Sequence, residues 1–209
     1  MVKEELISDE QARTVLRKIL SLYPNARGEL NWDTKFHLLC AVLMSAQTTD
    51  KMVNSVTPKL FSDYPDSFSL SRAEIGDIED HIKTIGLFRS KAKHLKETAT
   101  IISEKYNGKI PADKKLLMQL PGVGEKTANV VLAEGFNIPA IAVDTHVSRI
   151  SKAFKIVDQK AKPHDVELRL EQLLPKDQWI KTHHAMILFG RYTMPARSKD
   201  KNPYHYLPD

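Results

Sequence analysis

Hydrophobic positions recur along this chain with the three- and four-residue spacing of α-helices. Ser8 is a typical helix-capping residue, and the apolar stripe behind it predicts a first helix to about Leu22, through Ala12, Val15, Leu16, Ile19 and Leu20. The segment 34–44 is apolar on almost every side, which indicates a central buried helix. Similar patterns predict further helices over 50–64, 68–70, 75–82, 89–106, 144–154, 163–174 and 178–191. No segment alternates as a strand would, so the predicted class is all-α.

The tail after Arg191 has no apolar period and contains two prolines before Tyr204. We expect it to be extended and to be packed against the rest of the chain by apolar and aromatic side chains, namely Tyr192, Tyr204, Tyr206 and Leu207.

A turn rich in glycine leads into a helical pattern at residues 120–132. Its residues are Leu120, Pro121, Gly122, Val123 and Gly124. Glycine permits positive φ and a close backbone approach, so such a turn can present free amide N–H groups to an anion, above all to a phosphate. A corner between two helices also needs glycine for structural reasons, so the motif alone leaves both interpretations open.

Two residues close to this turn can carry chemistry. Lys126 lies in the first turn of the new helix, where its charge opposes the helix dipole, and Asp144 occupies a predicted N-cap. A neutral lysine is a nucleophile, and a carboxylate can take up a proton or stabilise a developing cation. Taken separately, the lysine also fits a solvated surface or a phosphate contact, and the aspartate an ordinary cap. We interpret His146 as a hydrogen-bonding residue at the helix start.

The charge distribution favours a polyanionic partner. The chain of 209 residues has a net charge of +5 and an isoelectric point of about 9.1. Residues 81–126 hold ten Lys and Arg residues against four acidic ones, an excess larger than that of the whole chain. This stretch predicts a phosphate-binding face that includes Arg89, Lys91 and Lys93, although a solvated helix face remains the simpler alternative.

Composition excludes several other classes. Cys40 is the single cysteine, so these residues form no internal disulfide and no metal site built from several thiolates. No apolar run reaches about eighteen residues, and the first residues lack the apolar core of a signal peptide, so we expect a cytoplasmic protein without membrane contact. His183 and His184 are adjacent on a helix and have no third ligand nearby in sequence, so we expect no metal site there.

Three motifs together resemble the endonuclease III family of helix-hairpin-helix DNA glycosylases. They are Ser45-Ala46-Gln47, the stretch from Leu120 to Ala128, and Val143-Asp144-Thr145-His146. The resemblance extends from about Glu29 to Thr193. It implies two helical lobes with a DNA-binding groove between them: a six-helix barrel lobe with the hairpin at 28–138, and a second lobe from 1–27 and 139–209.

The resemblance also implies a bifunctional base excision repair enzyme that acts on double-stranded DNA containing damaged pyrimidines or abasic sites. Lys126 would form a Schiff base with the deoxyribose, followed by β-elimination, and Asp144 matches the catalytic carboxylate. Gln47 matches a residue that fills the gap left by the flipped nucleotide, and the hairpin amides, together with Arg89 and Lys91, would contact the DNA. We expect a monomer associated with the nucleoid. A monofunctional glycosylase, a non-catalytic DNA-binding module and a helical scaffold remain as alternatives.

The sequence departs from the family pattern in its tail. Most members end with four cysteines that bind a [4Fe-4S] cluster, the first of them directly after the Gly-Arg-Tyr-Thr segment, where this chain has Met194. We therefore expect no iron–sulfur cluster and a C-terminal lobe stabilised by packing. Basic side chains in the tail would partly replace the DNA contact, namely Arg197, Lys199 and Lys201. The family fold also allows a monovalent cation at the hairpin carbonyls.

Overall fold

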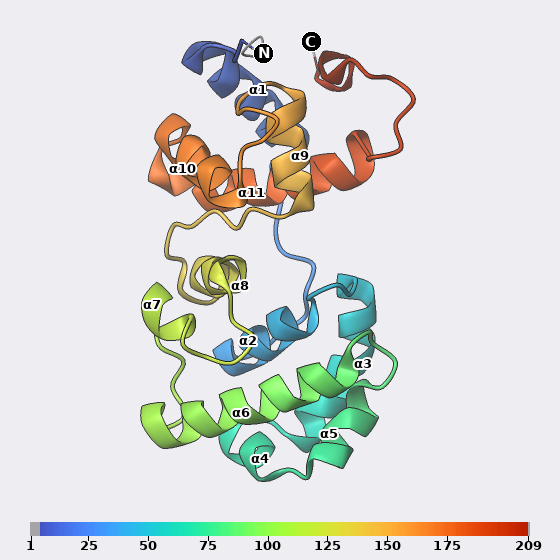
Figure 1. Ribbon diagram of the computed structural model, residues 1–209, viewed down its shortest axis with the longest axis vertical. Coiled ribbons are helices and arrows are strands. Elements are labelled where there is room, and N and C mark those ends of the chain that lie inside the picture. Colours follow the sequence, from blue (N-terminus) through green and yellow to red (C-terminus); the bar gives the residue numbers. More distant parts are fainter. Residues whose placement is uncertain (1–4, 209) are drawn as a thin grey trace. The chain divides into compact units, whose positions relative to one another are not determined.

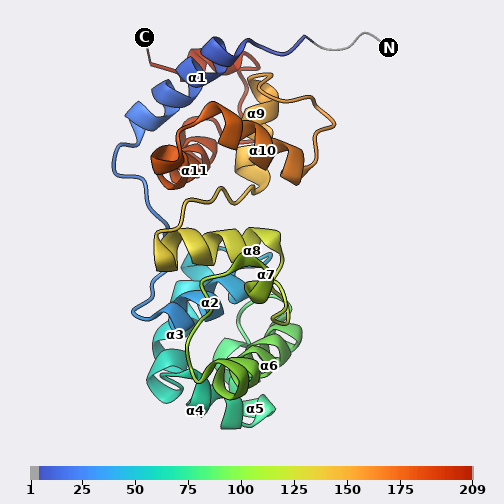
Figure 2. The same ribbon diagram turned by 90° about the vertical axis from the view of Figure 1, so that its left-hand side faces the viewer.

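Every regular element is helical between residues 5 and 208, the part of the chain that this computed structural model describes. These described residues form two compact units, shown in Figures 1 and 2: one is Glu29–Ile138, and the other joins the N-terminal residues up to Gly28 with those from Pro139 onward. The expected lobes included residues 1–4 and 209, which lie outside the described residues. No helix within 5–208 is long and apolar enough to cross a membrane.

The unit Glu29–Ile138 is built around α2 (Lys35–Met44), as the all-round apolar pattern predicted. Nine of its ten residues are buried, and Thr34 caps it by accepting the His37 N–H. In chain order the other helices of the unit are α3 (Asp50–Asp63), α4 (Ser67–Arg72), α5 (Ile75–Ile82), α6 (Phe88–Tyr106), α7 (Lys114–Leu117) and α8 (Glu125–Val130), which continues as a π-helical turn, Val131–Gly135. Of these, α3, α6, α8 and the π-helical turn contact α2, whereas α4 and α5 pack against α6.

The other unit packs α1 (Asp9–Leu22) and α9 (Thr145–Ala153) against α11 (Trp179–Leu188). The predicted cap of α1 is confirmed, since Ser8 and Gln11 form a reciprocal capping box. Phe154 and Phe189 are fully buried at the centre, with ring centroids 6.2 Å apart. The remaining elements are α10 (Pro163–Leu173), the short 3₁₀ helices Lys176–Gln178 and Pro203–Tyr206, and a π-helical turn, Phe189–Thr193.

The C-terminal region differs from the sequence prediction in two ways. The helix expected over 178–191 ends at Leu188 and continues as the π-helical turn, in which the Met194 N–H donates to the Phe189 carbonyl. The tail expected to be extended contains a 3₁₀ helix, whose Tyr204 packs edge-on against Phe154 at 5.3 Å. Tyr192, expected to pack, is 64% exposed. A periodicity argument misses these features because π and 3₁₀ turns are set by local backbone hydrogen bonds.

Candidate active site

The glycine turn between α7 and α8 is a tight hairpin. Gly122 has φ +75°, and a Cβ there would lie 2.7 Å from Nδ1 of His94, so both its conformation and its packing require glycine. Gly124 differs from expectation: its φ is −90°, and a Cβ there would meet nothing within 4 Å. The fold of this chain therefore does not itself demand glycine at position 124.

Two hairpin side chains point into the protein. Leu120 and Val123 are buried in the core of the Glu29–Ile138 unit, and the Pro121 carbonyl accepts a 3.3 Å hydrogen bond from Thr98 Oγ1. The buried side chains hold the turn in place, so Leu120 and Val123 have only backbone groups to offer a ligand. Because Gly124 is the N-cap residue of α8, no side chain caps the first amides of that helix.

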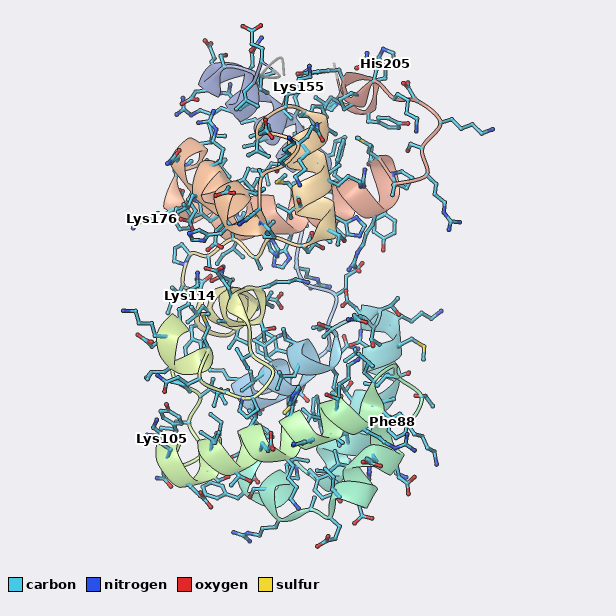
Figure 3. The ribbon with its side chains drawn as sticks, viewed as in Figure 1. Phe88, Lys105, Lys114, Lys155, Lys176 and His205 are labelled. Carbon is cyan, nitrogen blue, oxygen red and sulfur yellow. The ribbon has the colours of Figure 1, made fainter. Side chains whose placement is uncertain are left out.

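Lys126 is the second residue of α8, and its side chain is exposed. The adjacent Glu125 carboxylate forms a 2.9 Å ion pair with Lys114 of α7, which Figure 3 labels beside α8. The exposed Lys126 amine thus follows directly on a rigid turn.

Asp144 is the N-cap of α9, as predicted, and its Oδ1 accepts a 2.8 Å hydrogen bond from the Val147 N–H. This bond fixes the carboxylate at the helix start. It lies in the other unit from Lys126. On the same helix, Arg149 Nη2 donates to the carbonyls of Gly190 at 2.9 Å and Met194 at 2.6 Å. Burial lowers the pKa of Arg149, and the negative charge of Asp144 acts in the opposite direction.

Four exposed residues of the Glu29–Ile138 unit have left-handed backbone conformations, and two of them, Asn107 and Asn137, are of a type that tolerates this region. Gln47, in the loop after α2, has φ +55°; Leu87, the residue before α6, has φ +58° and is 60% exposed. Leu87 was not predicted from the sequence as a candidate site residue. The sequence did contain a hint in the run Ile85-Gly86-Leu87-Phe88, where a leucine follows the glycine of a turn. Turns are normally at the surface, so an apolar side chain there is unusual.

The residues of the predicted basic face differ in exposure: Arg89 and Lys93 are exposed, whereas Lys91 is buried. Arg89 is exposed, with its guanidinium 4.8 Å from the centre of the Phe88 ring. Lys91 is only 5% exposed, and its Nζ donates a 2.6 Å hydrogen bond to Thr48 Oγ1. Burial lowers its pKa. An exposed phosphate contact was therefore the wrong placement for Lys91: on the helical repeat its side chain turns toward the core, together with Ala92 and Leu95.

The residues of the C-terminal segment do not fit an iron–sulfur cluster. Met194, at the position of the first cluster cysteine, is 9% exposed and belongs to the hydrophobic core of its unit. Cys40 lies buried in the other unit, where burial raises the pKa of its thiol far above the usual range. The adjacent His183 and His184 are both buried, and burial lowers the pKa of His184 to about 4.

Comparison with known proteins decides the family. Residues 40–176 match the HhH-GPD superfamily of base excision DNA repair proteins. Endonuclease III of Bacillus subtilis (strain 168) is 42% identical over 193 residues, which cover 92% of this chain and 88% of that protein. Endonuclease III of Escherichia coli (strain K12) is 40% identical over 183 residues, covering 88% and 86%. The chain belongs to the endonuclease III family.

Solved structures agree with this assignment. A trapped covalent intermediate of an endonuclease III with DNA superposes with a TM-score of 0.90 at 42% identity, covering 92% of this chain and 91% of that one. A thermostable thymine-DNA glycosylase, at 22% identity and a TM-score of 0.80, shares the fold. As an endonuclease III homologue over most of its length, the chain is a base excision repair DNA glycosylase and abasic-site lyase.

Proposed function

We propose that this enzyme excises oxidised pyrimidines from double-stranded DNA by a lysine Schiff-base mechanism. The observation that carries the proposal is the placement of Lys126: an exposed amine in the first turn of α8, directly after a rigid hairpin, in a chain of this family. A lysine amine placed in this way can act as a nucleophile in its neutral form.

In the proposed reaction the Lys126 nitrogen bonds to C1′ of the flipped nucleotide. The glycosidic bond breaks, and the base leaves with the bonding electron pair. Opening of the sugar ring gives the Schiff base. Loss of a C2′ proton then expels the 3′ phosphate by β-elimination, which cuts the strand.

Asp144 is the proposed acid–base residue. Its Oδ1 is held by the helix cap, and Oδ2 accepts no hydrogen bond from the described residues. A carboxylate fixed in this way can accept the amine proton and stabilise positive charge on the sugar.

The hairpin is proposed to hold a backbone phosphate with its amides. The open space at Gly124 supports this, because glycine there serves no contact within the described chain and instead allows another backbone to approach. Carbonyls of the same turn are the proposed ligands of a monovalent cation. Phosphate contacts position the enzyme and leave lesion choice to the pocket.

Gln47 and Leu87 are the proposed probes of the base stack. Both are exposed and held in left-handed conformations that cost free energy, and apolar side chains that enter a base step are a common device of proteins that distort DNA. Gln47 would fill the space of the flipped nucleotide and Leu87 would wedge the neighbouring step.

The enzyme is proposed to work as a monomer at the nucleoid and without an iron–sulfur cluster. Support for the last point is the poor fit described above: one buried cysteine, and a core methionine at the first ligand position. Arg197, Lys199 and Lys201 would supply phosphate contacts from the tail.

The test uses a duplex with one thymine glycol and follows free base and nicked strand separately. The parent should produce both at matching rates. Lys126→Gln should lose both by on the order of 10³-fold or more, and Asp144→Asn should also lose both while still binding DNA. Base release without nicking would indicate a monofunctional glycosylase, and binding without either product would indicate a non-catalytic module.

A further inference from the structure

We infer that Lys91 is a positioning residue that locks the two DNA-probing residues, Gln47 and Leu87, into one rigid unit. The inference rests on the function proposed for those two residues. Lys91 was expected to touch phosphate, yet its ammonium is buried and bonded within the protein. Lys91 forms hydrogen bonds both to the loop that contains Gln47 and to Leu87.

One contact reaches the loop of Gln47. The Lys91 Nζ donates to Oγ1 of Thr48, the residue next to Gln47, across 2.6 Å. Gln47 itself has φ +55°, a conformation that a non-glycine residue holds only where its surroundings impose it. A hydrogen bond to the adjacent side chain is such a restraint.

The other contact reaches Leu87. The Lys91 backbone N–H donates to the Leu87 carbonyl at 3.0 Å, the first hydrogen bond of α6, and fixes the left-handed residue at its start. Phe88, labelled at this end of α6 in Figure 3, is half-buried. The side chain of Lys91 therefore ties the Gln47 loop to the first turn of α6, the turn that begins at Leu87.

The two segments also approach each other directly. A Cβ on Gly86, the residue before Leu87, would lie 4.0 Å from the Gln47 carbonyl oxygen. The two segments are therefore neighbours in space, without a hydrogen bond between Gly86 and Gln47. The buried ammonium supplies the polar bond between them.

Burying the charge of Lys91 costs desolvation free energy, so a role in packing alone does not explain a lysine at this position. Among the described residues no carboxylate pairs with the Lys91 ammonium, and burial is the cause of its lowered pKa. A leucine or methionine would fill the same space without desolvating a charge, but would not bond to Thr48. What the ammonium adds at this position is the hydrogen bond that fixes the Thr48 hydroxyl.

The experiment measures base-stack opening apart from binding. All proteins carry Lys126→Gln to prevent chemistry, and the duplex holds thymine glycol opposite 2-aminopurine, whose fluorescence rises when its stacking is lost. Lys91→Met and Thr48→Val are compared with Lys59→Met, which removes an exposed lysine of α3 in the same unit. The dissociation constant comes from anisotropy of a labelled duplex.

We expect Lys91→Met and Thr48→Val each to reduce the fluorescence rise at saturation at least threefold, with dissociation constants less affected. The double variant should be no worse than either single one, because both remove the same bond. Lys59→Met should keep the full rise. A full rise in both Lys91→Met and Thr48→Val would overturn the inference.

Two controls distinguish a failure of the inference about Lys91 from a failure of the proposed function. If Lys91→Met does not fold, Thr48→Val, which keeps the side-chain shape, decides the matter alone. If the Lys126→Gln parent binds the duplex without any fluorescence rise, the proposed roles of Gln47 and Leu87 fail, and the inference fails with them.

Discussion

Arg149 donates a 2.6 Å hydrogen bond to the backbone carbonyl of Met194, the residue at the position of the family's first cluster cysteine. The same guanidinium nitrogen reaches the Gly190 carbonyl at 2.9 Å. Asp144 begins the helix that carries Arg149. A side chain of α9 therefore fastens the chain segment from Gly190 to Met194 to the helix that begins after Asp144.

Replacing Arg149 with Met should destabilise the protein and weaken catalysis. It removes two hydrogen bonds from a charged donor, together worth about 3–6 kcal/mol, and leaves two carbonyls without this partner. Urea unfolding measures the first effect and single-turnover base release the second. Lys152→Met, on the same helix, is the matched control. A change below about 0.5 kcal/mol would show that the link is incidental.

Treatment that destroys iron–sulfur clusters should leave this enzyme unaffected. Its proposed stability comes from packing of Met194 and the tail, so dialysis against an iron chelator with ferricyanide removes nothing that the fold uses. Nicking of a duplex with an abasic site and the thermal midpoint should both match the untreated protein. Visible cluster absorption in the purified protein, or activity lost on treatment, would contradict this expectation.

Glu134 should make the protein less stable as pH rises. Burial raises the pKa of its carboxyl from 4.5 to about 7, against a hydrogen bond from Trp32 that lowers it, with the Asp50 charge also raising it. Between these two values the folded state binds more protons than the unfolded state, so stability falls as pH increases from 4.5 to 7.

Glu134→Gln removes this titration and keeps an acceptor for Trp32. We expect the variant to gain stability relative to the parent at pH 8 but not at pH 4, as measured by the free energy of unfolding in urea at the two values. An equal difference at both pH values would mean that the carboxyl titrates normally in the folded protein.

The exposed cations of α6 should set the salt dependence of DNA binding. Arg89 and Lys93 are exposed, whereas Lys91 is buried. If both exposed side chains meet phosphate, Arg89→Gln with Lys93→Gln should reduce the slope of log affinity against log salt concentration by about 2. Lys91→Met should leave that slope unchanged, because its charge is not presented to the duplex. A slope unaltered by the double change would place the phosphate contacts elsewhere.

Helices and their caps could be predicted from the sequence because their signals are local. The apolar stripe after Ser8 predicts a helix with one buried face, and the apolar run of α2 predicts a helix buried on all sides. Asp144 is an aspartate, a residue type that commonly caps helices. The hairpin was predictable for the same reason, since a positive φ at Gly122 excludes most other residues.

What the sequence could not supply depends on neighbours far along the chain. Lys91 counts as a surface charge until its partner Thr48, 43 residues earlier, is known. The sequence suggested that Gly124, like Gly122, has a positive φ, but its backbone is extended. What is unusual about Gly124 is the empty space that a Cβ would enter, and this space can be seen only in the structure. Leu87 was passed over because hydrophobicity alone assigns a leucine to the core.

Borohydride trapping tests whether Lys126 is the nucleophile, because reduction converts the Schiff base into a stable covalent link. The enzyme is incubated with a duplex carrying one thymine glycol, reduced, digested, and the cross-linked peptide is located by mass spectrometry. We expect an adduct on Lys126 that is absent in Lys126→Gln. An adduct on another amine, or undiminished trapping in the variant, would contradict it.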